Sequence, residues 1–472
     1  PSCRIYIGKE SQVVNDDIIE GTDNDTQVLH CPECNVDVNV KDNRRAGNIF
    51  LYLPLTAQLK DFCQRHHEDL SYVKNREKKS FYAIEDIFDG ISYKKSLPND
   101  SPEDMISINF SIDGTPLFKR SVTSITPILC TINELHPQQR KHQIFLTSVV
   151  LGSTKPIMNE YLKPFVAECK SLFNEGFDYN SNEIIYHKKC QLLLGICDSV
   201  ERPELRGSKS FRGQYGCGLC KHPGEEIAKG NGSVRVYPIN AEGNPYGEGL
   251  RSHTETLNHI NSYDKGMKYR STLCDIPNFD IIDNLVPDWM HCVALGVCRQ
   301  FLKLWFDTSY HDKEFYLGQH LPSIDEMLLF FKPSMDISRT PRKMSKDRLH
   351  LKAHELVIWL LFYSLPILRR FLPNKFVQHW SLLVEGISIL LKTAIMESDV
   401  YNAQRYLFQF VKDVEKLYGK EHLSFNLHLL THLPKSVLKW GPLWTHSAFC
   451  YENFHQFLKK LVKSSNSADL QI

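Results

Sequence analysis

Between residues 105 and 152 the chain alternates apolar and polar side chains, which is the pattern of strands with one face toward a core. The stretch "MISINFSIDGTPLFKRSVTSITPILCTI" (105–132) alternates on both sides of Asp113 and Gly114, and "HQIFLTSVVLG" (142–152) repeats the pattern. These residues predict three strands, and their closeness along the chain favours antiparallel pairing.

A helix and a further strand are expected next. Apolar residues recur at helical spacing at Leu162, Phe165, Val166, Cys169, Leu172 and Phe173. The run "CQLLLGICDS" (190–199) is then almost wholly apolar until Asp198, as in a strand buried on both faces. The predicted order of three strands, a helix and a strand indicates an α/β fold.

Composition and turn residues divide the chain into five segments. They are a polar, acid-rich start (1–46), a small helical and basic segment (47–100), the strand-rich segment (101–230), a mostly helical insertion (231–420) and a C-terminal segment with two short helical patterns (421–472).

The bulk composition describes a globular protein. At 472 residues the chain can form two or more domains, and 42% apolar with 24% charged residues argues against extensive disorder. The net charge of +1 means that nucleic-acid binding would depend on local patches. Fourteen cysteines with two CxxC pairs favour reduced thiols and metal binding, and therefore the cytosol or nucleus.

No segment predicts a membrane span. The most apolar stretch, "LVIWLLFYSLPIL" from Leu356, contains Ser364 and Pro366, and it falls short of the ~20 apolar residues that a spanning helix needs. The chain begins with Pro1, and no charged and then apolar leader follows, so we expect a fragment of a longer product without a visible secretory signal.

Three carboxylates are candidates for divalent metal binding. Asp113 and Asp198 lie at predicted strand ends, and Glu452 begins a helical pattern among aromatic residues. Oxygen ligands suit Mg²⁺, and a two-metal site clamps the attacking and leaving oxygens of a phosphodiester. The alternatives are that Asp113 forms an Asp-Gly hairpin turn, that Asp198 caps the next helix and that Glu452 makes an unrelated salt bridge.

A family resemblance covers nearly the whole chain. It rests on the joint order of "SIDGTPLF", "INEL", "KPIMNEYLKPFV", "YGCGLC", "DWMHCVALGV", "LKAHE", "FNLHLLTHL" and "GPLWTHSAFCYENF". In this order, together with the three acids, the chain resembles DDE transposases of the CACTA (En/Spm) superfamily.

The resemblance implies a fold, an activity and partners. The fold would be an RNase H-like catalytic core, with a mixed sheet flanked by helices, which the large helical insertion interrupts. Asp113, Asp198 and Glu452 would hold two Mg²⁺ or Mn²⁺ ions for DNA cleavage and strand transfer. The partners would be double-stranded DNA, as transposon ends and target, and a second copy of the chain in a homodimer or higher oligomer in the nucleus.

Two other functions remain open at this level. One is a catalytically silent or domesticated protein, derived from such a transposase, that binds DNA or protein. The other is a simple zinc-binding scaffold, for which no closeness of the three carboxylates is expected.

A structural zinc site is predicted at Cys217 and Cys220, which form a CxxC pair between glycines. Tetrahedral coordination needs two more ligands, which are either local, through His222, or His428 and His432 at i, i+4 spacing. The second arrangement resembles the catalytic subunit of the V(D)J recombinase, in which such pairs bind one zinc. The alternative is a pair of small buried thiols.

Weaker motifs complete the set. Cys31 and Cys34 are half of a second zinc motif, with Cys3 and His30 as conceivable partners. Asp288 and His291 in "DWMH" are accessory candidates near the active site, and the alternative for them is a helix-start Asp and a core His.

A basic segment is a candidate DNA contact. The stretch from Arg339 to Lys352 has six Lys or Arg against one Asp in an expected loop, and a solvated loop explains it nearly as well. The residues that we expect to contact phosphates are Arg339, Arg342, Lys343, Lys346 and Arg348.

Overall fold

The computed structural model describes residues 28–30, 37–39, 49–96, 104–118, 123–334, 337 and 339–462. Its strands are β1 (Val28–His30), β2 (Asp37–Asn39), β3 (Ile49–Tyr52), β4 (Met105–Ile112), β5 (Thr115–Pro116), β6 (Ser124–Ile132), β7 (Phe145–Gly152), β8 (Phe177–Ser181), β9 (Ile184–Cys197), β10 (Glu225–Lys229), β11 (Gly232–Val236) and β12 (Leu285–Pro287). Its α-helices are α2 (Leu55–Arg65), α3 (Tyr72–Asn75), α4 (Ile91–Ser96), α5 (Pro137–Arg140), α6 (Met158–Asn174), α7 (Glu201–Arg206), α8 (His253–Ser262), α9 (Arg299–Phe306), α10 (Leu321–Phe330), α11 (Met344–Asp347), α12 (Ala353–Ile358), α13 (Ser364–Phe371), α14 (Asn374–Leu390), α15 (Glu397–Tyr418), α16 (Phe425–Leu430), α17 (Leu433–Trp440) and α18 (Phe449–Leu461).

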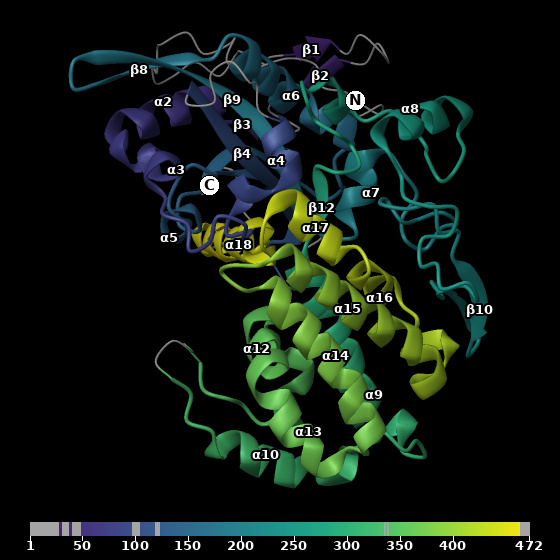
Figure 1. The fold of residues 1–472 in the computed structure, drawn as a ribbon. Coiled ribbons are helices and arrows are strands. Elements are labelled where there is room, and N and C mark those ends of the chain that lie inside the picture. The colour runs from purple at the N-terminus through teal and green to yellow at the C-terminus, as the bar shows by residue number, and fades with distance from the viewer. Residues whose placement is uncertain are drawn as a thin grey trace.

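A mixed sheet forms the centre of the upper part of the molecule (Figure 1). Among the described residues its strand order is β12-β9-β4-β6-β7-β3, with β5 beside β6 and β8 beside β9. β4, β6 and β7 pair antiparallel, whereas β9 runs parallel to β4 and β12 runs parallel to β9. The prediction of an α/β fold with three antiparallel strands, a helix and a strand is confirmed.

Helices cover both faces of the sheet, so the alternation in β4 separates two buried environments. Ile106, Ile108 and Phe110 pack in one core with residues of α2 and α6. Ser107 and Asn109 point to the other face, where Asn109 and Asn133 exchange side-chain hydrogen bonds of 2.8 and 3.1 Å. Apolar residues of α4, α17 and α18 form a further core with β6, β9 and β12.

The structure corrects the alternative that Asp113 and Gly114 form the hairpin turn. β4 ends at Ile112, and the chain continues into β5, in which Thr115 pairs with Ile125 of β6. The reversal of the chain therefore lies beyond β5, and Asp113 occupies a break between two segments that pair with the same strand. Gly114 suits this break, since a Cβ atom there would lie 3.3 Å from the Oγ1 atom of Thr126.

A second, helical unit lies below the sheet in Figure 1 and contains α9, α10 and α12 to α15. Its core holds the buried side chains of Trp305, Trp359 and Trp380. β12 lies within the range 231–420 yet belongs to the central sheet, so this segment contributes to both units. Within the described ranges, no helix is both long and apolar enough to cross a bilayer.

Candidate metal and nucleic-acid site

An aspartate follows each of the three parallel strands of the sheet. Asp113 follows β4, Asp198 follows β9 and Asp288 follows β12. Because these strands are neighbours and run parallel, their carboxyl ends meet at one edge of the sheet. The ends of β4 and β9 are also joined by a hydrogen bond of 3.3 Å, which the backbone amide of Ile112 donates to the thiol of Cys197.

Helix α18 brings Glu452 to this edge. Ligand atoms of Asp113, Glu452 and His455 all lie within 4.8 Å of one another, so these three side chains could hold a metal ion. Asp198 is outside that group, but it is close enough for its charge to act on Asp113. The structure therefore brings the three predicted carboxylates to one edge of the sheet. Asp113 and Glu452 belong to the group that could hold one metal ion, and Asp198 lies outside it.

Two of the carboxyl groups at this edge, Asp113 and Glu452, have raised pKa values. Burial, followed by the negative charges of Asp198 and Glu452, raises the pKa of Asp113 to about 7. Burial also raises the pKa of Glu452 above its ordinary value, although the nearby His291 opposes this. Crowded carboxylates of this kind suit a cation, because an ion would replace the protons and offset the repulsion.

His291 is held at the same edge by Asp288. Its Nδ1 atom lies 2.8 Å from Oδ2 of Asp288, and its Nε2 atom lies 3.6 Å from Oε1 of Glu452. Burial alone would lower the pKa of His291, but the hydrogen bond and charge of Asp288, with the charges of Asp198 and Glu452, raise this pKa to about 9. His291 is thus a cation among the carboxylates.

Asp288 is fully buried, and both of its oxygens are used. Oδ2 also accepts a hydrogen bond from the backbone amide of His291, and Oδ1 accepts one from the amide of Ala448, each of 2.9 Å. Burial would raise the pKa of Asp288, but its bonds to His291 and Ala448 lower that pKa. Asp288 therefore has the helix-start role that was the alternative, and it also holds His291 beside Glu452.

Asp198 lies at the acidic edge and also binds the start of the next helix. Its Oδ1 atom accepts hydrogen bonds of 2.8 and 2.7 Å from the amides of Val200 and Glu201, so it caps the start of α7 as the alternative expected. Glu201 itself is buried, lies near Asp113 and pairs with Lys155 at 2.7 Å. Sequence reasoning missed Glu201, and its position three residues after Asp198 was the only signal.

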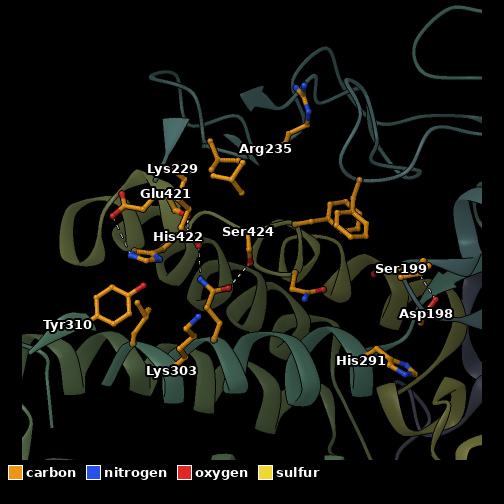
Figure 2. Close-up of a pocket in the computed structure, with 18 residues that line it drawn as sticks. Asp198, Ser199, Lys229, Arg235, His291, Lys303, Tyr310, Glu421, His422 and Ser424 are labelled. Atoms are coloured by element: carbon orange, nitrogen blue, oxygen red, sulfur yellow. Dashed lines mark hydrogen bonds and ion pairs between the residues drawn. The ribbon is translucent and has the colours of Figure 1, made fainter. Parts of the chain in front are cut away.

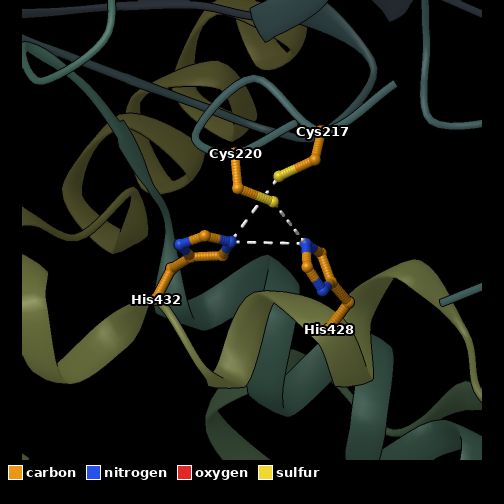
Figure 3. Close-up of side chains that lie close together, drawn as sticks. All are labelled: Cys217, Cys220, His428 and His432. Carbon is orange, nitrogen blue, oxygen red and sulfur yellow. Dashed lines mark hydrogen bonds between the residues drawn. The ribbon is translucent and has the colours of Figure 1, made fainter. Parts of the chain in front are cut away.

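A second group that could hold a metal consists of Cys217, Cys220, His428 and His432 (Figure 3). The Nε2 atoms of the two histidines lie 3.3 Å apart, and each also faces a thiol. Sγ of Cys217 lies 3.6 Å from His432, and Sγ of Cys220 lies 3.3 Å from His428. All four side chains are buried. The predicted CxxC pair and histidine pair are therefore close in space, although the helical insertion separates them in the sequence.

The loop that carries the cysteines is tightly packed. Arg251 donates from Nε to the carbonyl oxygens of Cys217 and Cys220, each at 3.0 Å. A Cβ atom at Gly218 would lie 1.7 Å from the guanidinium of Arg206, so a larger residue there would displace this buried side chain.

His222 lies outside this second group. Its Nδ1 atom accepts a hydrogen bond from the amide of Gly224, and its Nε2 atom lies 2.9 Å from the carbonyl oxygen of Pro238. Both ring nitrogens of His222 are therefore engaged by the backbone. The structure places His428 and His432, and not His222, beside the two cysteines.

A pocket of about 440 Å³ begins at the acidic edge and extends along α9 (Figure 2). Asp198 and His291 line one end, and Lys303 lines the other. Lys229 and Arg235 of the β10–β11 hairpin line the opposite wall. The pocket thus has one carboxylate of the acidic edge, Asp198, at one end, and basic side chains together with a second carboxylate, Glu421, toward the other (Figure 2).

The basic segment is only partly available for other contacts. Arg342 binds both carboxylate oxygens of Glu355 at 2.7 Å, and Arg348 donates to backbone carbonyl oxygens of Met344 and Ser345. Lys343 and Lys346 are exposed. Arg339 lines a small pocket with Arg342, and its charge acts on Glu355.

Cys31 and Cys34 lie outside the described residues. Comparison of the chain with known protein families and with curated proteins finds no match to either.

Proposed function

We propose that this chain is the catalytic region of a DNA transposase, similar to the CACTA superfamily, that cleaves and joins phosphodiesters with divalent metal. The observation that carries the proposal is the meeting of Asp113, Asp198 and Glu452, which are distant in sequence, at the carboxyl edge of parallel strands. Three antiparallel strands, a helix and a strand parallel to the first also support an RNase H-like core.

The donor set fits hard or borderline divalent ions. Asp113 and Glu452 offer oxygens within 4.8 Å of each other. Burial, with the charges of neighbouring carboxylates, raises the pKa values of both groups, and a cation would offset that repulsion. A divalent ion supplies a water of lowered pKa and neutralises charge on the leaving oxygen. Asp113, Asp198 and Glu452 would hold it, and His291 would face the negative charge of the phosphate.

The pocket supports DNA as the substrate. The helical path from His291 to Lys303 is roughly 15 to 18 Å long, about the rise of five base pairs. Lys229 and Lys303 along it offer contacts to phosphates, whereas the guanidinium of Arg235 is engaged by Glu226 and by backbone carbonyl oxygens. The ring of Phe425, stacked on Phe211, offers an apolar surface.

The second group supports a structural zinc. A tetrahedron with zinc bond lengths has N to N edges of ~3.3 Å and S to N edges of ~3.6 Å. The observed distances of 3.3, 3.6 and 3.3 Å fit these edges. Four protein ligands leave no position for a reacting water, so this ion would join the cysteine loop to α16 and α17, which precede α18.

The test is nicking of duplex DNA by the zinc-loaded chain with Mg²⁺ or Mn²⁺. Wild type should nick, and Asp113→Asn and Glu452→Gln should lose this activity while they still bind DNA. Asp312→Asn, which changes an exposed carboxylate, is the matched control. Equal nicking by wild type and Asp113→Asn would overturn the assignment. DNA binding without nicking by wild type would instead favour a silent, transposase-derived binding protein.

A further inference from the structure

Helix α18 carries an imidazole beside the carboxylate site. Glu452 and His455 are three residues apart on α18, so their side chains lie on one face of the helix. That face is turned toward the end of β4, where Asp113 lies. A Glu-x-x-His pair on one helix is the arrangement with which di-iron and di-manganese carboxylate proteins bind their ions.

The ring of His455 is buried without a hydrogen bond to any residue that the structure describes. Its side chain is 2% exposed, and neither ring nitrogen has a hydrogen bond to another described residue. Nδ1 lies 3.8 Å from Oδ2 of Asp113, which is too long for a hydrogen bond. Buried ring nitrogens are usually satisfied, so two unsatisfied ones beside a carboxylate point to a missing ligand.

The separation of 3.8 Å suits two ligands of one ion. Donor atoms that each lie ~2.1 Å from an ion stand between ~3.0 Å apart, when adjacent, and ~4.2 Å apart, when opposite. The carboxylate of Glu452 lies within 4.8 Å of both groups and can complete the face of the same ion.

We propose that His455 is a direct metal ligand, so that Asp113, Glu452 and His455 form a mixed oxygen and nitrogen site that prefers a transition-metal dication such as Mn²⁺ to Mg²⁺. Mg²⁺ takes oxygen ligands and keeps several waters, whereas an imidazole nitrogen favours first-row transition metals. This rests on the proposed function for the reaction that the ion serves, but the binding itself is independent of DNA.

The first experiment measures Mn²⁺ and Mg²⁺ binding to the full chain without DNA. The zinc group is first filled with zinc, and free Mn²⁺ is followed by its electron paramagnetic resonance signal with Mg²⁺ as competitor. Wild type should bind Mn²⁺ more tightly than Mg²⁺. His455→Ala should weaken Mn²⁺ binding by at least about tenfold and leave Mg²⁺ binding nearly unchanged. Loss of a residue that only supports a metal ligand already costs about tenfold or more in affinity, so loss of a direct ligand should cost at least as much. Gln456→Ala, at the exposed neighbouring position, should bind both ions as wild type does.

The second experiment needs no variant, so it remains decisive if His455→Ala does not fold. Pulsed electron paramagnetic resonance of the Mn²⁺ complex should detect coupling to a directly bound ¹⁴N nucleus. Absence of that coupling, or equal loss of Mn²⁺ and Mg²⁺ binding in folded His455→Ala, would overturn the proposal. Nitrogen coupling in a chain that nicks no DNA would keep the proposal and remove only the proposed function.

Discussion

Oδ1 of Asp288 accepts a hydrogen bond of 2.9 Å from the backbone amide of Ala448, 160 residues farther along the chain. This bond joins the end of β12 to the residue that precedes α18. Oδ2 of the same carboxylate holds His291. One buried side chain therefore fixes both the helix that carries Glu452 and the imidazole that faces it.

Asp288→Asn should separate these two tasks. The amide oxygen of asparagine can still accept from Ala448, but its NH₂ group cannot accept from the backbone and Nδ1 of His291. We expect nicking to fall by about 10 to 100-fold, with DNA binding retained. The free energy of unfolding should fall by ~1–3 kcal/mol, because buried donors lose their acceptor. Nicking rates, DNA affinity and thermal unfolding measure these effects, and an Asn variant with wild-type nicking would show that His291 needs no such support.

The main elements of the fold could be predicted because their periodicity is local. Alternation identified β4, β6 and β7, helical spacing identified α6, and an unbroken apolar run identified β9. β12 was missed since three residues carry no period, and its strand character comes from pairing with β9. The reversal after β5 was missed because the Asp-Gly pair matches a turn signal that pairing with β6 overrides.

The site was predictable where spacing or family resemblance identified its residues, and not where tertiary contacts define it. The carboxylates at strand ends and the Cys and His pairs have such signals. The link from Asp288 to α18 depends on a hydrogen bond with Ala448, which no sequence pattern indicates. The inference that His455 is a metal ligand depends on its burial without a hydrogen bond to another described residue. The spacing of three residues between Glu452 and His455 is visible in the sequence. It indicates a metal site only because the structure also places Asp113 beside both side chains.

Removal of the metal from the cysteine and histidine group should destabilise the chain. Wild type should hold about one zinc in this group, and Cys217→Ser should hold none there. We expect a lower melting temperature for Cys217→Ser and for chelator-treated wild type, because metal binding is coupled to folding. Metal analysis and calorimetry measure this, and Cys274→Ser, which changes a cysteine outside the group, is the matched control.

His222 should be dispensable for that metal. His222→Gln should keep the zinc content of wild type, because its ring nitrogens bond to Gly224 and Pro238 and not to the ion. Loss of zinc in a folded His222→Gln chain would contradict the ligand set of two cysteines and two histidines.

Lys303 should contact a DNA phosphate in the pocket. Lys303→Ala should weaken binding without sequence preference and reduce the slope of log affinity against log salt concentration by about 0.7 to 0.9, the value for one phosphate contact. Lys170→Ala, on the exposed side of α6 and away from the pocket, should leave that slope unchanged. Titrations at several salt concentrations measure the slope. A larger effect from Lys343→Ala with Lys346→Ala than from Lys303→Ala would move the DNA path to the basic segment.

Glu134 should make stability depend on pH independently of any metal. Its carboxylate is buried and accepts hydrogen bonds from the amide and hydroxyl of Ser107 at 2.9 and 2.6 Å. Burial raises its pKa from 4.5 to about 7, although the bonds from Ser107 oppose this. Between these two pH values the folded chain keeps a proton that the unfolded chain has lost. The contribution of Glu134 to the free energy of unfolding therefore falls as the pH rises, and it becomes constant above pH 7.

Glu134→Gln removes this titration and keeps a side chain of the same shape. The difference in unfolding free energy between variant and wild type should therefore shift in favour of the variant by roughly 3 kcal/mol from pH 4.5 to pH 7. Denaturant unfolding at a series of pH values measures it, and Glu183→Gln, at an exposed turn, controls for the loss of one carboxyl group. Parallel pH profiles for wild type and Glu134→Gln would mean that Glu134 is already ionised in the fold, and that its bonds to Ser107 outweigh the effect of burial.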